Sequence, residues 1–166
     1  MNDVGDFFVA WGKALNAKDG GGIASICTED VVWEDSALVS GESLHGRAAV
    51  SVFLEQYLFR PIPDLRYDLL ELLWSDDGTK AVERARLSGT LRGPVKPLGL
   101  APTGRPIAFE VAGFFEFREG NARRVRIILD MLDIARQTGA APLPGTFSDR
   151  LVSGLQHLKA WRLRRR

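Results

Sequence analysis

Apolar residues in the first part of the chain recur three and four residues apart, the period of an amphipathic helix. This pattern predicts a helix over residues 3–17 that begins at Asn2 or Asp3 as N-cap and ends before the glycines at 20–22. A short second helix and a longer third one follow, and the third ends at Pro61 and Pro63. The predicted apolar faces are Phe7, Phe8, Trp11 and Leu15; Ile23, Ile26 and Cys27; and Val50, Phe53, Leu54, Tyr57 and Leu58.

The remaining segments have the two-residue period and the turn residues of β-strands. A strand over residues 31–35 places Val31, Trp33 and Asp35 on one face. Two hairpins are predicted, formed by residues 66–74 and 80–91 around Asp76-Asp77-Gly78 and by residues 105–118 and 122–132 around Glu119-Gly120-Asn121. Because Asp-Gly supplies the positive φ angles of a type I′ turn, we expect that turn in the first hairpin.

Helices followed by an antiparallel meander predict an α+β domain, with the helices on one side of a curved sheet. Strong curvature leaves the concave face partly unfilled and so makes a pocket. The loop over residues 92–104 is rich in proline and glycine, and its length predicts a lid or a wall of that pocket. We expect one domain over residues 1–140, and a linker with a basic C-terminal helix over residues 141–166.

Composition narrows the class of protein. The 166 residues include 22 basic and 21 acidic ones, a net charge of +1, which gives no electrostatic footprint for nucleic acid. Apolar runs are far shorter than the roughly 18 residues of a membrane span, and residues 1–8 have no signal-peptide pattern, so we expect a cytoplasmic protein. One cysteine, Cys27, excludes an intramolecular disulfide and disfavours a thiolate metal site. No phosphate-binding loop or metal triad is recognisable, so we expect no metal and no cofactor.

Several short runs occur together in a familiar order: residues 30–35 (DVVWED), 46–49 (GRAA), 63–66 (PDLR), 88–90 (SGT), 98–106 (LGLAPTGRP) and 114–120 (FFEFREG). Over residues 4–140 the chain resembles the SnoaL-like polyketide cyclase family of the nuclear transport factor 2-like superfamily. The resemblance implies a cone-shaped fold in which a bent antiparallel sheet is wrapped by N-terminal helices around an apolar pocket. Because this fold carries cyclases, isomerases, epoxide hydrolases and binding modules, it does not name a reaction.

Asp35 is the first candidate for chemistry. It ends an apolar strand on the face of Trp33, where burial should raise its pKa and suit it to proton transfer. It also matches the general-base position of the ketosteroid isomerases. The two oxyanion-binding positions of those enzymes match Trp11, which offers one N–H donor, and Gly113, which has no side chain, so their usual two-donor site is ruled out. The alternative is an Asp that caps the following loop.

Arg84 and Asp130 match an arginine and a water-activating aspartate of the limonene-epoxide hydrolases, whereas Arg86 stands where those enzymes have their acid. Two arginines two residues apart on a strand face the same way. In one alternative both arginines point inward and pair with Asp35 and Asp130, since unpaired buried guanidinium groups are costly. The catalytic residues would then be Asp35, Asp130 and Arg84. In the other alternative both arginines lie on the solvated convex face. The sequence leaves both alternatives open.

Further side chains are candidates for binding the substrate, although core packing or solvation explains each of them as well: Trp11, Trp33, His45, Tyr57, Arg86, Phe109, Val111 and Phe115. We expect a cofactor-independent acid–base enzyme of cyclase or isomerase type, acting on a small apolar, partly oxygenated metabolite, and a homodimer. The alternatives are epoxide hydrolysis or epoxide-opening cyclisation, and a non-catalytic binding or scaffold module. A cavity under roughly 300 Å³ would favour the last.

Overall fold

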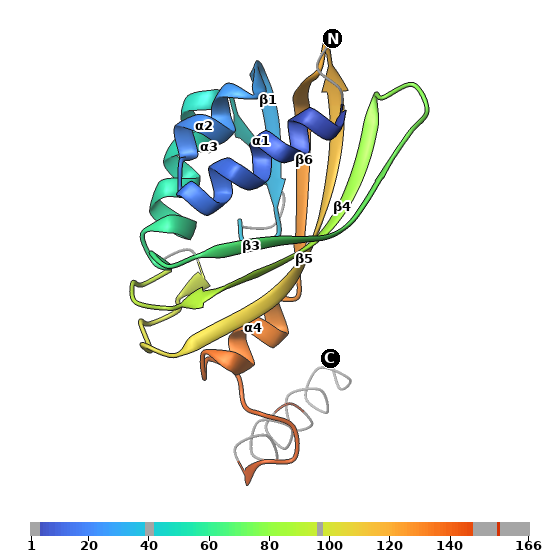
Figure 1. Cartoon of the computed structure of the whole chain (residues 1–166). Helices are drawn as coiled ribbons and strands as arrows, with labels where there is room; N and C mark the ends of the chain where they lie inside the picture. The colour runs from blue at the N-terminus through green and yellow to red at the C-terminus, as the bar shows by residue number, and fades with distance from the viewer. Residues whose placement is uncertain (1–3, 39–41, 96–97, 148–155, 157–166) are drawn as a thin grey trace, which may run out of the picture.

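The computed structural model describes residues 4–38, 42–95, 98–147 and 156. A curved six-stranded sheet, in the order β2-β1-β6-β5-β4-β3, has helices α1, α2 and α3 on one face (Figure 1). The predicted α+β class with a bent sheet and N-terminal helices is confirmed. The boundary at residues 140/141 stays a prediction, and most of the predicted C-terminal helix falls outside the described residues.

The helices follow the apolar spacing of the sequence. Helix α1 (Val4–Ala17) buries the face that carries Phe7 and Trp11. Helix α2 (Gly20–Ser25) is capped by the Asp19 side chain, which accepts a hydrogen bond from the Gly22 N–H at 2.7 Å. Helix α3 (Arg47–Leu54) continues into a π-helical turn, η1 (Glu55–Phe59). Such turns often occur at functional sites, and this one presents Tyr57 to the pocket described below.

The strands are β1 (Cys27–Asp35), β2 (Leu44–His45), β3 (Arg66–Trp74), β4 (Lys80–Thr90), β5 (Pro106–Arg118) and β6 (Asn121–Leu129). The sheet is antiparallel except that β1 pairs with β6 in parallel. The two predicted hairpins, β3–β4 and β5–β6, are both present.

The turn types of the hairpins differ from the prediction. In the first hairpin only Gly78 has a positive φ angle, +65°, so the Asp-Gly pair does not form a type I′ turn. In the second, Glu119 and Gly120 have φ angles of +54° and +78° and connect the paired residues Arg118 and Asn121. Two consecutive positive φ angles place the type I′ geometry in this hairpin instead.

The predicted end of the last strand is also wrong. Strand β6 ends at Leu129, not at residue 132, because Asp130 caps a further helix, α4 (Met131–Gln137). The Asp130 side chain accepts a hydrogen bond from the Asp133 N–H at 2.9 Å. Gln137 ties α4 to β5 through hydrogen bonds in both directions with the Ala108 backbone.

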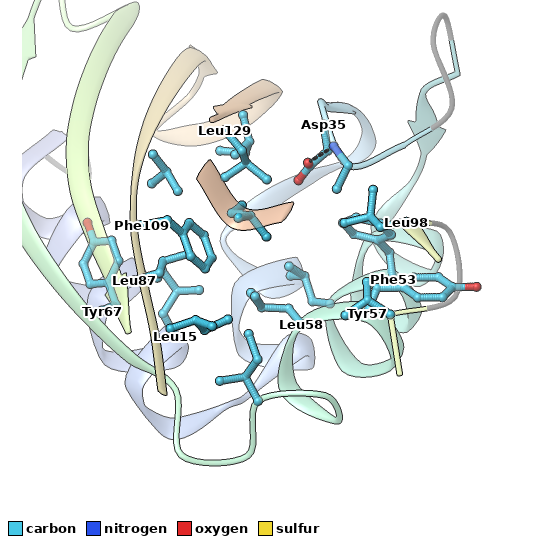
Figure 2. A pocket seen from close by; sticks show the side chains of 18 of the residues that line it. Leu15, Asp35, Phe53, Tyr57, Leu58, Tyr67, Leu87, Leu98, Phe109 and Leu129 are labelled. Carbon is cyan, nitrogen blue, oxygen red and sulfur yellow. Dashed lines mark hydrogen bonds between the residues drawn. The ribbon is translucent and has the colours of Figure 1, made fainter. Parts of the chain in front are cut away.

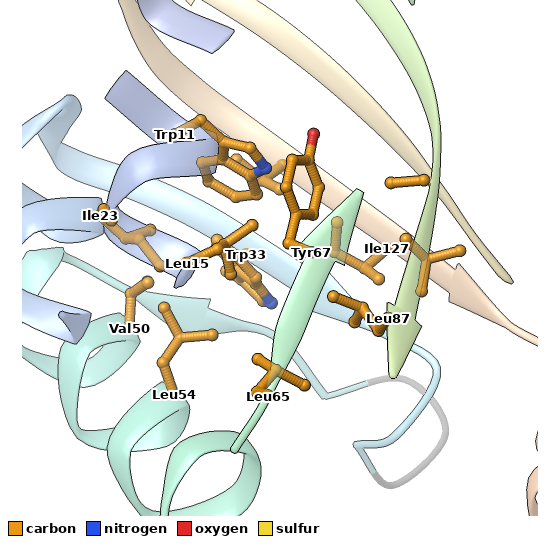
Figure 3. Close-up of a cluster of buried hydrophobic side chains, with 14 of the residues drawn as sticks. Trp11, Leu15, Ile23, Trp33, Val50, Leu54, Leu65, Tyr67, Leu87 and Ile127 are labelled. Atoms are coloured by element: carbon orange, nitrogen blue, oxygen red, sulfur yellow. The ribbon is translucent and has the colours of Figure 1, made fainter. Parts of the chain in front are cut away.

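Aromatic rings fill the part of the concave face beneath α1. Phe115 packs edge-to-face on Trp11, Phe7 and Phe8, and Trp11 stacks on Trp33 with ring centroids 5.8 Å apart. Figure 3 shows Trp11 and Leu15 of α1 close to Trp33 and Tyr67 of the sheet. These rings close one part of the hollow inside the sheet and leave a pocket in the remainder.

Candidate functional site

The pocket lies between the concave face of the sheet, the α3–η1 segment and α4 (Figure 2). Its volume is about 110 Å³. The described residues that line it are apolar or aromatic apart from two carboxyl groups, Asp35 and Glu83. A carboxyl group in such a wall is poorly solvated, so its charged form is disfavoured.

The loop over residues 92–104 supplies one wall, as predicted. Its base is closed by backbone hydrogen bonds between Leu91 and the pair Gly104 and Arg105. Within it, Val95 and Leu100 pair across a short antiparallel bridge. Both of these side chains line the pocket, as does Leu98.

Asp35 is placed by the alternation of β1, because Trp33 lies on the same face and is buried while Glu34 points to the convex side. Its Oδ1 accepts a hydrogen bond from the Ala37 N–H at 2.8 Å, and its Oδ2 a longer one from the Trp33 indole at 3.4 Å. Burial raises the pKa of Asp35 to about 6, and these two hydrogen bonds limit the rise. At neutral pH most of this carboxyl is therefore ionised and able to accept a proton.

Glu83 is the second carboxyl, and sequence reasoning missed it. Its side chain is 1% exposed, and its Oε2 accepts a hydrogen bond from the Tyr67 hydroxyl at 2.5 Å. Burial raises the pKa of Glu83 to about 7, although the nearby Tyr67 and Trp11 lower it. Burial and the neighbouring Glu83 carboxylate in turn raise the pKa of Tyr67 above its usual value.

A signal for Glu83 is present in the sequence. Along β4, Ala81, Glu83, Ala85 and Leu87 are buried and the alternate residues are exposed. If Arg84 and Arg86 point outward, Glu83 must point inward, because adjacent strand residues face opposite sides.

Arg84 and Arg86 lie on the convex face, outside the pocket. Arg84 is half exposed and pairs with Glu71 and Glu110, and Arg86 also pairs with Glu110. The predicted Asp–Arg–Asp arrangement is therefore not formed, and the solvated alternative is correct. Glu71 of β3 and Glu110 of β5 pair with these guanidinium groups on a face that is still exposed to solvent.

Three further candidates lie outside the pocket. Asp130 is exposed and caps α4. His45 is exposed and hydrogen-bonds the Ser43 hydroxyl at 3.1 Å. Phe115 is 2% exposed and belongs to the aromatic core beneath α1. The expectation that they act at the site is contradicted by these positions, whereas the other candidates do line the pocket: Trp11, Trp33, Tyr57, Phe109 and Val111.

Among the described helices, none is long and apolar enough to cross a membrane. Within the same residues, no group of three or more His, Cys, Asp or Glu side chains is arranged to hold a metal ion.

Comparison with known proteins gives a family and a fold. The model of the SnoaL-like domain matches residues 8–125. No curated protein matches this chain.

Solved structures with a similar fold include TsrD from Streptomyces laurentii, which is 22% identical with a TM-score of 0.71 over 83% of this chain and 96% of that one. A SnoaL-like polyketide cyclase from Agrobacterium tumefaciens is 24% identical with a TM-score of 0.67, covering 82% and 98%. A protein with a ketosteroid isomerase-like fold from Catenulispora acidiphila is 16% identical with a TM-score of 0.66, covering 81% and 92%. These likenesses establish the shared fold.

Proposed function

Since this chain belongs to the SnoaL-like family, we propose that it is a cofactor-independent acid–base enzyme of cyclase or isomerase type, with Asp35 as the group that transfers the proton. The observation that supports this most is a carboxyl group with a pKa of about 6 in a pocket that, apart from Glu83, is lined by apolar and aromatic side chains. A general base is most effective when its pKa lies near the working pH.

In the proposed step, the Asp35 carboxylate takes a proton from a carbon next to a carbonyl group. The electron pair of the broken C–H bond forms the carbon–carbon double bond of an enolate, and the negative charge moves to the carbonyl oxygen. Asp35, now neutral, returns the proton to the same or another carbon. Oδ1 accepts the shorter hydrogen bond, from the Ala37 N–H at 2.8 Å, so we assign the proton transfer to Oδ2, which has the weaker hydrogen bond.

The cavity volume limits the substrate. About 110 Å³ is below the roughly 300–1,000 Å³ of typical small-molecule pockets. The substrate that fits this form of the pocket is a small apolar molecule with one oxygen, rather than a polycyclic one.

The same volume favours a second candidate function, a non-catalytic binding or scaffold module. Epoxide opening through Asp130 and Arg84 has no such support, because both side chains lie outside the pocket.

The test is hydrogen–deuterium exchange at the carbons beside the carbonyl of cyclohexanone, followed by NMR in D₂O. We expect the wild type to accelerate exchange over buffer, with a rate that rises with pH through about 6 as Asp35 ionises. Asp35→Asn should lower the acceleration by about 10²–10⁴-fold. The control is Asp130→Asn, which changes a surface cap.

Equal acceleration by the wild type and Asp35→Asn would refute the assignment of the base. Binding of cyclohexanone without any acceleration would favour the binding module. The predicted homodimer is tested separately, by size-exclusion chromatography with light scattering.

A further inference from the structure

Asp35 and Glu83 occupy the two ends of one row of paired positions across the sheet. Asp35 of β1 pairs with Ile127 of β6, Ile127 with Gly113 of β5, and Gly113 with Glu83 of β4. Three strand spacings correspond to about 14 Å along a flat sheet. Because this sheet is curved, the two carboxyl groups face the same hollow from opposite walls, and Figure 2 shows Asp35 and Tyr67 on opposite sides of the pocket.

Gly113 gives the Glu83 side chain its place in this row. A Cβ atom at position 113 would lie 2.9 Å from both Cγ and Oε1 of Glu83, and 2.7 Å from a ring carbon of Phe115. Real Cβ atoms do not approach other atoms so closely. The Glu83 carboxyl therefore uses space that any other residue at position 113 would fill.

The hydrogen bonds around this carboxyl are incomplete. Among the described residues, Tyr67 is the one hydrogen-bond partner of the Glu83 side chain, and it contacts Oε2. The indole N–H of Trp11 is close enough to lower the pKa of Glu83, but the geometry between them is not that of a hydrogen bond. This N–H is buried and has no partner among the described residues, although buried donors are nearly always hydrogen-bonded.

We propose that Trp11, Tyr67 and Glu83 form a polar subsite of the pocket that binds a carbonyl oxygen of the ligand. The protonated Glu83 carboxyl donates its O–H from Oε1 to the ligand oxygen, while Oε2 accepts the Tyr67 hydrogen bond. The Trp11 N–H supplies a second donor to the same ligand oxygen. A protonated carboxyl group and a nearby buried indole N–H without a partner suit an acceptor, and the apolar remainder of the wall suits a hydrocarbon body. This inference rests on the proposed function only in placing a ligand in the same pocket.

The protonation state follows from the surroundings. Burial favours the neutral form of Glu83, and its pKa of about 7 leaves much of it protonated at neutral pH. Tyr67 of β3 is the titratable group in contact with it, and Asp35 of β1 is the other carboxyl of the pocket; α1 and β5 contribute Trp11, Gly113 and Phe115, which do not titrate. Ionisation of Glu83 removes its donor, so ketone binding should weaken above about pH 7.

The rival explanation is that Glu83 only ties β4 to β3 through Tyr67. A pair of ligands of the same shape separates the two explanations: cyclohexanone, with a carbonyl oxygen, and methylenecyclohexane, with a CH₂ group in its place. NMR titration of the ¹⁵N-labelled protein gives both dissociation constants. The ratio of the two constants cancels effects that are equal for both ligands. A protonated Asp35 could also donate to the ketone, but a pH-dependent preference that comes from Asp35 would persist in Glu83→Gln.

For the wild type, we expect the ketone to bind about tenfold more tightly than the alkene near pH 5.5, and this preference to shrink several-fold near pH 8.5. Glu83→Gln, which keeps an N–H donor but cannot ionise, should retain a preference that does not change with pH. Glu83→Leu should lose the preference at both pH values. Glu110→Gln, on the exposed face of β5, is the matched control and should behave as the wild type.

Equal binding of the two ligands to the wild type, or no binding of either, would overturn the proposal. So would a pH-dependent preference that persists in Glu83→Gln, a readout that does not require Glu83→Leu to fold. Failure of the proposed function is distinguishable, because proton exchange would then be absent while the Glu83-dependent preference for the ketone remained.

Discussion

Replacing Glu83 by glutamine should make the stability of the protein less sensitive to alkaline pH. Glu83 is buried with a pKa of about 7, against 4.5 in an unfolded chain. Glutamine has nearly the same shape and can still accept the Tyr67 hydrogen bond, but it carries no charge that burial can penalise.

The sign follows from proton binding. Below about pH 4.5 Glu83 is protonated in both states, and the stability that it contributes is fully present. As the pH rises, the unfolded state loses its proton first, so this contribution falls until the folded state also ionises near pH 7. The rise in the pKa of Glu83 from 4.5 to about 7 corresponds to about 3 kcal/mol in total, most of which is lost between about pH 5 and pH 8.

The assay is urea unfolding of the wild type and Glu83→Gln at several pH values, followed by tryptophan fluorescence. The difference in free energy of unfolding, variant minus wild type, should increase by about 2–3 kcal/mol from about pH 5 to pH 8. Taking the difference removes the contribution of Asp35, whose raised pKa acts in the same direction in both proteins.

A difference that stays constant with pH within about 0.5 kcal/mol would refute the reasoning, since it would mean that Glu83 titrates normally in the folded protein. Tyr67→Phe provides the complementary control. It removes the donor that stabilises the charged carboxylate, so the pKa of Glu83 should rise further and the loss of stability should extend to higher pH.

Three other predictions concern positions around the pocket. Gly113→Ala should cost about 1–3 kcal/mol in urea unfolding and alter the pH dependence, because its Cβ would press on Glu83 and Phe115. Arg84→Ala should change stability by less than about 1 kcal/mol and leave proton exchange unchanged; a large loss of exchange would return Arg84 to the site. Phe115→Ala should cost about 3–5 kcal/mol, whereas its matched neighbour Phe114→Ala, 43% exposed, should cost much less; similar costs would contradict the assigned faces of β5.

The elements that the sequence predicts well are those with local signals. The apolar spacing of α1 and the positions of the two glycine-containing turns, though not the turn type of the first, depend on residues near one another in the chain. Asp35 is predictable for the same reason, because its position beside Trp33 needs only the alternation of one strand. The prediction for Asp130 is wrong. The mostly apolar segment 127–132 suggests that the strand continues, but Asp130 accepts a hydrogen bond from the Asp133 N–H and so starts a helix instead.

The sequence does not predict the inward position of Glu83 or the core position of Phe115, because distant segments determine the surroundings of both side chains. Strand β4 carries charges in both of its phases, and the inward place of Glu83 is made available by Gly113, thirty positions away on β5. Phe115 shares a face with Phe109 and Val111, but only the rings of α1 decide which part of that face is core and which is pocket.

The parallel pairing of β1 with β6 has a consequence for how the protein is made. Among the described strands, β1, which carries Asp35, has the two-residue β2 as its one neighbour besides β6. Its link to β6 spans almost the whole domain, as in the hydrogen bond between Ser36 and Leu129, 93 positions apart. Contacts at such separation form late, since they require most of the chain to be ordered. During synthesis, β1 leaves the ribosome well before β6, with which it pairs. The cavity can therefore be completed only after β6 has been synthesised.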